Sequence, residues 1–366
     1  MKILNVNELS LTEKIGQMII VGVDGTTVSP RLKKLILDYK IGGVILYRRN
    51  FSTYEEMKKL IEEIKEINKV NKIPMIFSID QEGGRVNRMP KEIKNLPSVN
   101  KIAKNMGIDG IKKSSSIIGE ILKSAGFNMN FYPVLDIKRF GDKHAIGDRA
   151  FSDNEEEVAK FGIIAMKEMQ SKKMISVVKH YPGHGATKKD SHFLLPIIFK
   201  SQKKLEKEDL VPFKECIKNG ADAILVGHLL VSNKTDFRPA SLSRKYIIKN
   251  LRMKNRYKGL IISDDLNMKA IKLMYGTKKA VEKAFKACND IIVFRFAEKE
   301  EKDSIENIYE CVKSKKIKEH RINKSVNRIL KMKEKYDFYN TKKSNDLDIE
   351  KINKEIDFIR EKSNME

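Results

Sequence analysis

Residues 177–192 have the sequence Val-Val-Lys-His-Tyr-Pro-Gly-His-Gly-Ala-Thr-Lys-Lys-Asp-Ser-His and contain three of the six histidines of the chain. The apolar run 174–178 before it predicts a buried strand that ends at Lys179 and His180. The glycines, the proline and the polar residues that follow predict a loop. Titratable side chains at the end of a buried strand, beside a glycine-rich loop, are typical of a functional site.

Short apolar segments like this one recur along the chain, and most of them are separated by segments with helical spacing. The predicted strands are 18–23, 41–46, 74–79, 128–134, 174–179, 221–226, 259–263 and 290–294. No two successive strands are joined by a two-residue hairpin signal, so parallel pairing is expected. Eight such units predict an α/β fold, a single (β/α)8 TIM-type barrel with a short C-terminal helical extension.

Polar residues with acid–base or ligand-binding chemistry lie just past the ends of several predicted strands. They are Asp80, Asp136, Lys179, His180, His228 and Asp264. The C-terminal ends of the strands of a (β/α)8 barrel meet on one face, where catalytic groups lie. We therefore expect these side chains to gather around one active site.

One barrel domain is expected over residues 1–337, followed by a linker and an amphipathic helix within residues 338–366. The apolar face of that helix is formed by Ile349, Ile352, Ile356 and Ile359. Packing of this face on the barrel wall is favoured over a contact between two copies, and the oligomeric state stays open. Inside the barrel domain, helices are predicted at 52–68, with Ser52 as N-cap, and at 111–124, 154–171, 202–218 and 277–287.

The composition limits the classes of partner and the compartment. The 366 residues include 73 Lys and Arg against 49 Asp and Glu, a formal net charge of +24. The basic residues are spread along the chain rather than gathered in an Arg-rich tract, so no nucleic-acid partner is expected. Cys216, Cys288 and Cys311 have neither disulfide nor zinc spacing, and neither a signal peptide nor a membrane-spanning segment is evident. A cytoplasmic protein without a membrane span is expected.

Two aspartates and a histidine are candidates for catalysis. Asp264 follows the predicted strand 259–263, where a carboxylate can act as a nucleophile or as a metal ligand. Its neighbour Asp265 is a candidate helix cap. Asp190 and His192 are two residues apart in the predicted loop, so their side chains can lie on the same side. A carboxylate beside an imidazole raises the imidazole pKa and orients the ring, which makes the pair a competent general acid–base.

These residues lie in motifs that resemble those of family 3 glycoside hydrolases, specifically the β-N-acetylglucosaminidase branch. The main one is Lys-His-Tyr-Pro-Gly-His-Gly at 179–185 with Asp-Ser-His at 190–192. The others are Asp-Gln-Glu-Gly-Gly-Arg-Val-Asn-Arg at 80–88, Asn-Phe-Tyr-Pro-Val-Leu-Asp at 130–136, Arg-Ala-Phe-Ser at 149–152 and Ser-Asp-Asp-Leu-Asn-Met at 263–268. The resemblance covers about residues 8–336, in the order of the family.

The resemblance implies a retaining hydrolase that forms a covalent glycosyl-enzyme and needs no metal or other cofactor. Asp264 would be the nucleophile, and His192, paired with Asp190, would be the acid/base in place of the usual carboxylic acid. The residues implied to bind the terminal sugar are Asp80, Arg88, Arg149, Lys179 and His180. The implied substrate is a terminal β-linked N-acetylglucosamine, carried on peptidoglycan (muropeptide) fragments in cell-wall recycling.

Four alternatives stay open at this point. A metal-dependent barrel hydrolase would use His and Asp ligands, but the first predicted strand lacks the His-x-His pair usual in such barrels. A β-glucosidase of the same family would need an acid/base glutamate on a second domain, and none fits after residue 336. A phosphorylase would use phosphate in place of water. A non-enzymatic basic binding protein would not depend on Asp264.

Overall fold

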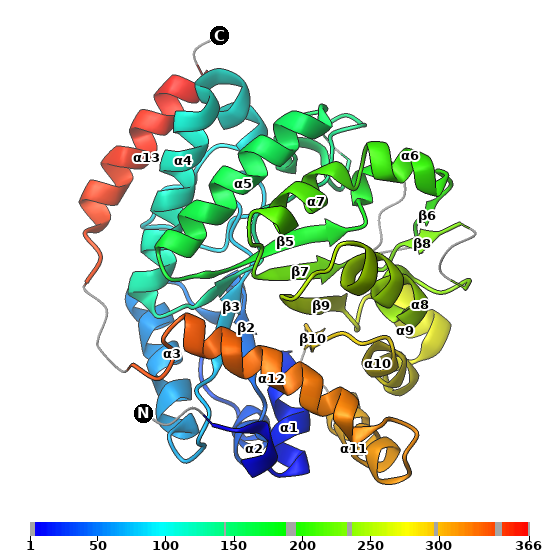
Figure 1. Ribbon diagram of the computed structural model, residues 1–366. Coiled ribbons are helices and arrows are strands. Elements are labelled where there is room, and N and C mark those ends of the chain that lie inside the picture. The colour runs from blue at the N-terminus through cyan, green and yellow to red at the C-terminus, as the bar shows by residue number, and fades with distance from the viewer. Residues whose placement is uncertain are drawn as a thin grey trace.

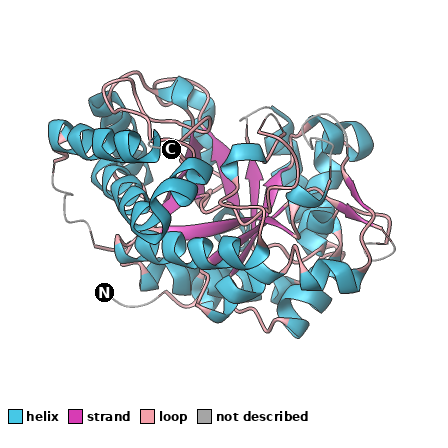
Figure 2. Cartoon of the chain, turned by 90° about the horizontal axis from the view of Figure 1, so that it is seen from above, coloured by secondary structure: helices cyan, strands magenta, loops and turns pink. Residues whose placement is uncertain are grey.

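The computed structural model describes residues 4–142, 144–187, 195–232, 236–295, 299–340 and 346–364. Its centre is a closed barrel of parallel strands in the order β1-β10-β9-β7-β5-β4-β3-β2 (Figure 1). The strands are β1 (Ile19–Gly22), β2 (Gly43–Leu46), β3 (Ile76–Ile79), β4 (Met129–Asn130), β5 (Ile175–Tyr181), β7 (Ala223–Val226), β9 (Leu260–Asp265) and β10 (Ile291–Phe294). Helices surround this barrel (Figure 2), so the predicted (β/α)8 fold is confirmed.

The predicted strands agree with the observed ones within two residues at each end, except β4. β4 pairs over two residues instead of 128–134, and Pro133, which has no N–H, cannot extend its ladder. β5 continues beyond residue 179 to Tyr181, so Lys179 and His180 belong to the strand itself. The structure also contains a separate parallel pair, β6 (Ile197–Ile198) and β8 (Leu230–Val231), which the sequence pattern did not predict. Strands of two residues are too short to show a periodic signal.

Helices cover the outside of the barrel, and capping residues mark where several of them begin. Thr53, rather than Ser52, is the N-cap of α3, because the Thr53 side chain accepts the Glu56 N–H and Glu56 accepts in return. The segment 202–218 forms two helices instead of one. The helices are α1 (Leu11–Gln17), α2 (Pro30–Leu37), α3 (Tyr54–Asn68), α4 (Val99–Ala125), α5 (Glu155–Ser171), α6 (Gln202–Lys207), α7 (Val211–Lys218), α8 (Arg244–Tyr246), α9 (Lys269–Tyr275), α10 (Thr277–Lys286), α11 (Lys299–Lys313), α12 (Glu319–Lys335) and α13 (Ile349–Asn364).

The two ends of the barrel are named here the mouth, at the C-terminal ends of the strands, and the floor, at their N-terminal ends. Lys333 of α12 is fully buried at the floor. Its Nζ donates to Gln17 Oε1 at 2.6 Å, to the Pro74 carbonyl at 2.7 Å and to the Gly42 carbonyl at 3.3 Å. These acceptors lie just before β1, β3 and β2, so one ammonium group joins three strand ends.

The C-terminal helix α13 lies beside α4 on the outside of the barrel (Figure 1). Its residues Ile352, Ile356 and Ile359 are buried. Asn353 accepts the Lys94 N–H and donates to the Glu92 carbonyl, which adds polar contacts at the edge. The apolar face of α13 is therefore covered within the same chain. Among the described helices, none combines the length and the apolar character that crossing a membrane requires.

Candidate active site

A cavity of about 350 Å³ opens at the mouth of the barrel. Six of the residues predicted from the sequence line it: Asp80, Arg88, Arg149, Lys179, His180 and Asp264. Pockets for small molecules usually measure about 300–1,000 Å³, so this one suits a small ligand such as a single sugar unit. Asp190 and His192 lie outside the described residues.

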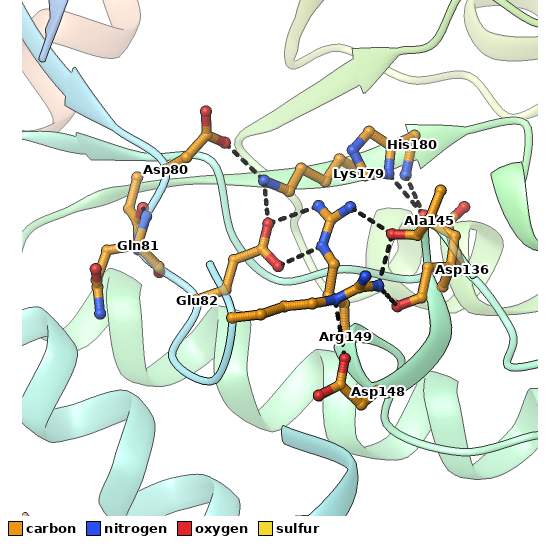
Figure 3. A network of polar contacts seen from close by, with 12 residues as sticks. Asp80, Gln81, Glu82, Asp136, Ala145, Asp148, Arg149, Lys179 and His180 are labelled. Carbon is orange, nitrogen blue, oxygen red and sulfur yellow. Dashed lines mark hydrogen bonds and ion pairs between the residues drawn. The ribbon is translucent and has the colours of Figure 1, made fainter. Parts of the chain in front are cut away.

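Lys179, near the end of β5, lies between two carboxylates (Figure 3). Its Nζ is 2.7 Å from Asp80 Oδ1 and 2.6 Å from Glu82 Oε1. Glu82 also accepts two hydrogen bonds of 2.8 Å from the guanidinium of Arg149. The side chains of Lys179 and Glu82 are each only 3% exposed. Burial of a charge is costly unless it is paired, and here each buried charge contacts an opposite one. This network fixes Asp80, Lys179 and Arg149 relative to one another.

Glu82 is a site residue that the sequence reasoning missed. Burial alone would raise the pKa of Glu82, but Arg149 and Lys179 hold that pKa well below its usual range. The Glu82 carboxylate is therefore ionised at neutral pH. Glu82 lies within the motif 80–88, two positions after Asp80, and this place next to a strand end was the only available signal.

Asp136 is fully buried and orients two histidines. Its Oδ2 lies 2.6 Å from His180 Nδ1, and its Oδ1 accepts the backbone N–H of His184 at 2.5 Å. Burial alone would raise the pKa of Asp136, but the two histidines hold it below its usual range. Since Nδ1 of His180 faces Asp136, Nε2 is the ring nitrogen that can contact a ligand in the cavity.

The Asp264-Asp265 pair ends β9 at the mouth. Asp264 lines the cavity, and its Oδ1 accepts the N–H of Asp265 at 2.9 Å. Asp265 does not cap a helix: its Oδ1 accepts the N–H groups of Asn267 and Arg295 at 3.0 and 2.9 Å. Burial raises the pKa of Asp265 to about 7, and the neighbouring charge of Asp264 adds to this shift.

His228 does not line the cavity, although it follows a strand end. Its Nδ1 lies 2.6 Å from Ser241 Oγ, and its Nε2 lies 2.9 Å from the Asp265 carbonyl. Burial lowers the pKa of His228, so the ring is neutral. His228 therefore supports the backbone next to Asp264 instead of contacting a ligand.

Further arginines and one tyrosine also line the cavity. Arg85 pairs with Asp148 at 3.0 Å, and Arg88 donates its backbone N–H to Gln81 Oε1 at 2.7 Å. The guanidinium of Arg295 lies over the ring of Tyr47, 5.6 Å from its centroid. Arg88 was predicted as a site residue. The contacts of Arg85 with Asp148 and of Arg295 with Tyr47 were not expected, because each joins residues far apart in the sequence.

Metal binding was one of the alternatives, because several candidate residues are potential ligands. In the described parts of the chain, no three His, Cys, Asp or Glu side chains are grouped so that they could hold a metal ion. His180 and His228 each use a ring nitrogen in the hydrogen bonds given above. The described site is one that could bind polar hydroxyl and amide groups and could place a carboxylate beside them.

A family model described as the glycosyl hydrolase family 3 N-terminal domain matches residues 10–332. A "Beta-hexosaminidase" of Neisseria gonorrhoeae is 35% identical over 268 residues, which cover 71% of this chain and 73% of the relative. A "Beta-hexosaminidase" of Hydrogenovibrio crunogenus is 31% identical over 281 residues, which cover 75% of this chain and 77% of the relative.

Solved structures agree with these sequence relatives. A glycoside hydrolase family 3 β-N-acetylglucosaminidase from Paenibacillus sp. str. FPU-7 superposes with a TM-score of 0.91 at 32% identity. The match covers 97% of this chain and 69% of that one. The similarity therefore includes nearly all of the present chain.

Proposed function

The chain belongs to glycosyl hydrolase family 3, and on this premise we propose that it is a retaining exo-β-N-acetylglucosaminidase. It is a glycoside hydrolase with β-N-acetylhexosaminidase activity, as in the relatives and the Paenibacillus structure. The observation that carries the finer proposal is the shared cavity of Asp264, Asp80 and Lys179 at the mouth. The Asp264 carboxylate, which can attack a sugar, lines the same small cavity as Asp80 and Lys179, which can form hydrogen bonds with that sugar.

In the proposed mechanism, the terminal sugar lies in the cavity with its hydroxyl and acetamido groups on the ion network. Asp80 accepts hydrogen bonds from sugar hydroxyls, and Arg149, Lys179 and His180 donate to hydroxyls or to the acetamido carbonyl. Arg88 donates from the rim. Because the network is already paired before the sugar arrives, little reorganisation is needed to bind it.

Asp264 is the proposed nucleophile. Its carboxylate oxygen attacks the anomeric carbon as the bond to the leaving oxygen breaks, which forms a covalent glycosyl-enzyme. His192, oriented and kept protonated by Asp190, gives its proton to the leaving oxygen. The neutral imidazole then takes a proton from the water that releases the sugar. The water oxygen bonds to the anomeric carbon as the bond to Asp264 breaks, so the sugar leaves with a new hydroxyl, Asp264 is a carboxylate again and His192 is protonated again.

The proposed natural substrate is a peptidoglycan (muropeptide) fragment that carries a terminal β-linked N-acetylglucosamine, as in cell-wall recycling. The basic residues Arg88 and Arg295 in the cavity lining support this, since such fragments carry carboxylates on the leaving side. A cytoplasmic location is part of the proposal, and the free cysteines Cys216, Cys288 and Cys311 suit a reducing compartment.

The test compares hydrolysis of p-nitrophenyl β-N-acetylglucosaminide with that of the matching β-glucoside. We expect a preference of about 100-fold or more for the N-acetylglucosaminide, because buried donors for the acetamido group would be left unpaired by a glucoside. Asp264→Ala should abolish turnover, and His192→Ala should slow it. Equal activity on the two sugars, or full activity of Asp264→Ala, would contradict the proposal. Release of sugar 1-phosphate in phosphate buffer would instead identify a phosphorylase.

A further inference from the structure

We propose that His144 is a positioning residue that holds Thr187, three residues before Asp190, and so acts on the proposed acid/base pair Asp190–His192. The proposal rests on the acid/base function proposed above for that pair. His144 belongs to none of the motifs quoted from the sequence, and it does not line the cavity. It lies in the connection between β4 and α5 and contacts the connection that follows β5.

The direct contact is a hydrogen bond from the His144 ring to the backbone of Thr187. His144 Nε2 is 2.9 Å from the Thr187 carbonyl oxygen, and Nδ1 accepts the backbone N–H of Ile146 at 3.2 Å. Because a carbonyl only accepts, Nε2 must carry the hydrogen, and because Nδ1 accepts, it must not. One neutral tautomer satisfies both bonds. Thr187 is 5% exposed, so this bond is shielded from water.

His144 is itself held in place from several sides. Its ring packs against that of Phe140 at a centroid distance of 4.9 Å. Its carbonyl accepts a hydrogen bond of 2.6 Å from Arg85 Nη2, and Arg85 Nε pairs with Asp148 at 3.0 Å. A residue so constrained can transmit a fixed position to the group that it binds.

The chain between His180 and Thr187 packs tightly on the segment after β4. A Cβ at Gly185 would lie 2.1 Å from the Ile137 carbonyl oxygen, so only glycine permits this approach. Asp136 binds the His184 N–H as well as the ring of the sugar-binding residue His180. The buried Asp136 carboxylate therefore orients His180, which is proposed to bind the sugar, and also the backbone at His184, which leads toward Asp190 and His192.

His184 fills the space between the two other histidines. Its ring centroid is 6.1 Å from that of His180 and 6.4 Å from that of His144, in both cases edge-on. Burial lowers the pKa of His184 to about 4. The ring is therefore uncharged at neutral pH and does not repel its neighbours.

The connection between β4 and α5 also contacts, indirectly, the chain that follows residue 194. Lys200 Nζ contacts Asp209 Oδ2 at 2.5 Å and Glu208 Oε2 at 2.8 Å. Arg139 binds the same two carboxylates, at 3.2 and 3.0 Å. The connection after β4 thus contacts Thr187 directly through His144. It contacts Lys200 indirectly, because Arg139 and Lys200 bind the same two carboxylates.

The geometry gives His144 influence over the proposed acid/base. Asp190 is three residues beyond Thr187, and three extended residues span at most roughly 11 Å. A fixed Thr187 therefore gives the chain that leads to Asp190 a fixed starting point. Loss of the His144 bond should misplace the proton donor without changing Asp264 or the sugar-binding network.

The test uses two substrates that differ in their need for a proton donor. The enzyme is assayed on phenyl β-N-acetylglucosaminide, a poor leaving group, and on the 2,4-dinitrophenyl analogue, which leaves without protonation. For His144→Ala we expect kcat/KM on the phenyl substrate to fall about 10- to 100-fold, the size expected for a misplaced catalytic group. On the dinitrophenyl substrate kcat/KM should fall by less than about 3-fold, because no general acid is needed.

His144→Gln should recover most of the phenyl activity, since its amide N–H can reach the Thr187 carbonyl. His144→Phe keeps the ring packing and lacks the donor, so it should behave like His144→Ala and serves if the alanine variant does not fold. The exposed His320→Ala is the matched control and should leave both substrates unchanged. Equal losses on the two substrates, or no loss, would overturn the positioning role.

His192→Ala separates this proposal from the one on which it rests. If His192→Ala shows the strong leaving-group dependence and His144→Ala does not, the positioning role is wrong and the acid/base assignment stands. If His192→Ala shows no leaving-group dependence, the acid/base assignment itself is wrong, whatever the His144 variants do.

Discussion

Two buried lysines lie at opposite ends of the barrel and are stabilised in different ways. At the mouth, Lys179 is in contact with the carboxylates of Asp80 and Glu82. At the floor, Lys333 donates to one side-chain amide oxygen and two backbone carbonyls. Burial lowers the pKa of Lys333 to about 7. The mouth therefore keeps its charges by pairing them, whereas the floor uses neutral oxygens and bears the cost of burial.

The difference follows from what each end does. A site for a neutral sugar needs ionised groups at fixed positions, and paired charges supply them at any working pH. The floor has only to close the barrel, and there a single ammonium group donates to three acceptors that lie just before three strands. The Gly42 carbonyl also accepts the Ile76 N–H, so the ammonium group contributes most at the Pro74 carbonyl and the Gln17 amide oxygen.

The largest expected effect tests the pairing at the mouth. In Lys179→Met, Glu82 keeps only Arg149 as its partner and Asp80 loses its lysine. We expect a loss of about 3–5 kcal/mol in the free energy of unfolding, as when one partner of a buried pair is removed. Activity should fall by about 100-fold, because the sugar-binding groups lose their alignment. Denaturant unfolding and initial rates on p-nitrophenyl β-N-acetylglucosaminide measure the two effects.

Lys333→Met is the matched control for this change, since it makes the same substitution at the floor. It should keep activity within about 2-fold and should cost about 1–3 kcal/mol at neutral pH, the range for acceptors left without a donor. Equal stability losses in the two variants would contradict the distinction between paired and unpaired burial.

The next effect is the pH dependence of stability that the floor imposes. Between pH 7 and about 10.4, the unfolded chain holds a proton on Lys333 that the folded chain has lost. The free energy of unfolding should therefore rise with pH across this window, by at most about 5 kcal/mol. Urea unfolding of the wild type and of Lys333→Met at pH 6.5, 8 and 9.5 would measure it. A rise that is equally large in the variant would assign the effect to other groups.

Asp265 at the mouth should give a smaller effect of the opposite sign. Its pKa is about 7 in the folded chain, so the folded state holds an extra proton between about pH 4 and pH 7. Stability should therefore fall as pH rises through this window, by at most about 4 kcal/mol. Asp265→Asn, which keeps the shape and both N–H contacts, should flatten this decline. If the wild type and the variant show the same decline between pH 4.5 and pH 7, Asp265 is not its source.

Much of the fold could be predicted because short apolar strands and amphipathic helices leave periodic patterns in the chain. Ile76–Ile79 and Leu260–Asp265 were placed within a few residues for this reason. β6 and β8 were missed, since two residues make no pattern. The choice of Thr53 over Ser52 as N-cap depended on which hydroxyl accepts the Glu56 N–H, which spacing alone did not decide.

The candidate site was predicted in part because polar residues at strand ends of a barrel must share one face. Asp80, Lys179, His180 and Asp264 were found in this way and line one cavity. His228 has the same position relative to its strand, and its side chain nevertheless binds Ser241 and the Asp265 carbonyl. Which way a side chain turns at a strand end depends on neighbours that the local sequence does not reveal.

The sequence by itself determined the barrel, the family and the residue types available at the mouth. Those properties depend on patterns within a few dozen residues, and the chain carries them wherever it folds. Tertiary structure alone decided which charges are paired, because Lys179 and Glu82, or Lys333 and Gln17, meet only when the barrel closes. The same closure brings His144 to Thr187 and buries Asp265, and burial is what shifts the Asp265 pKa.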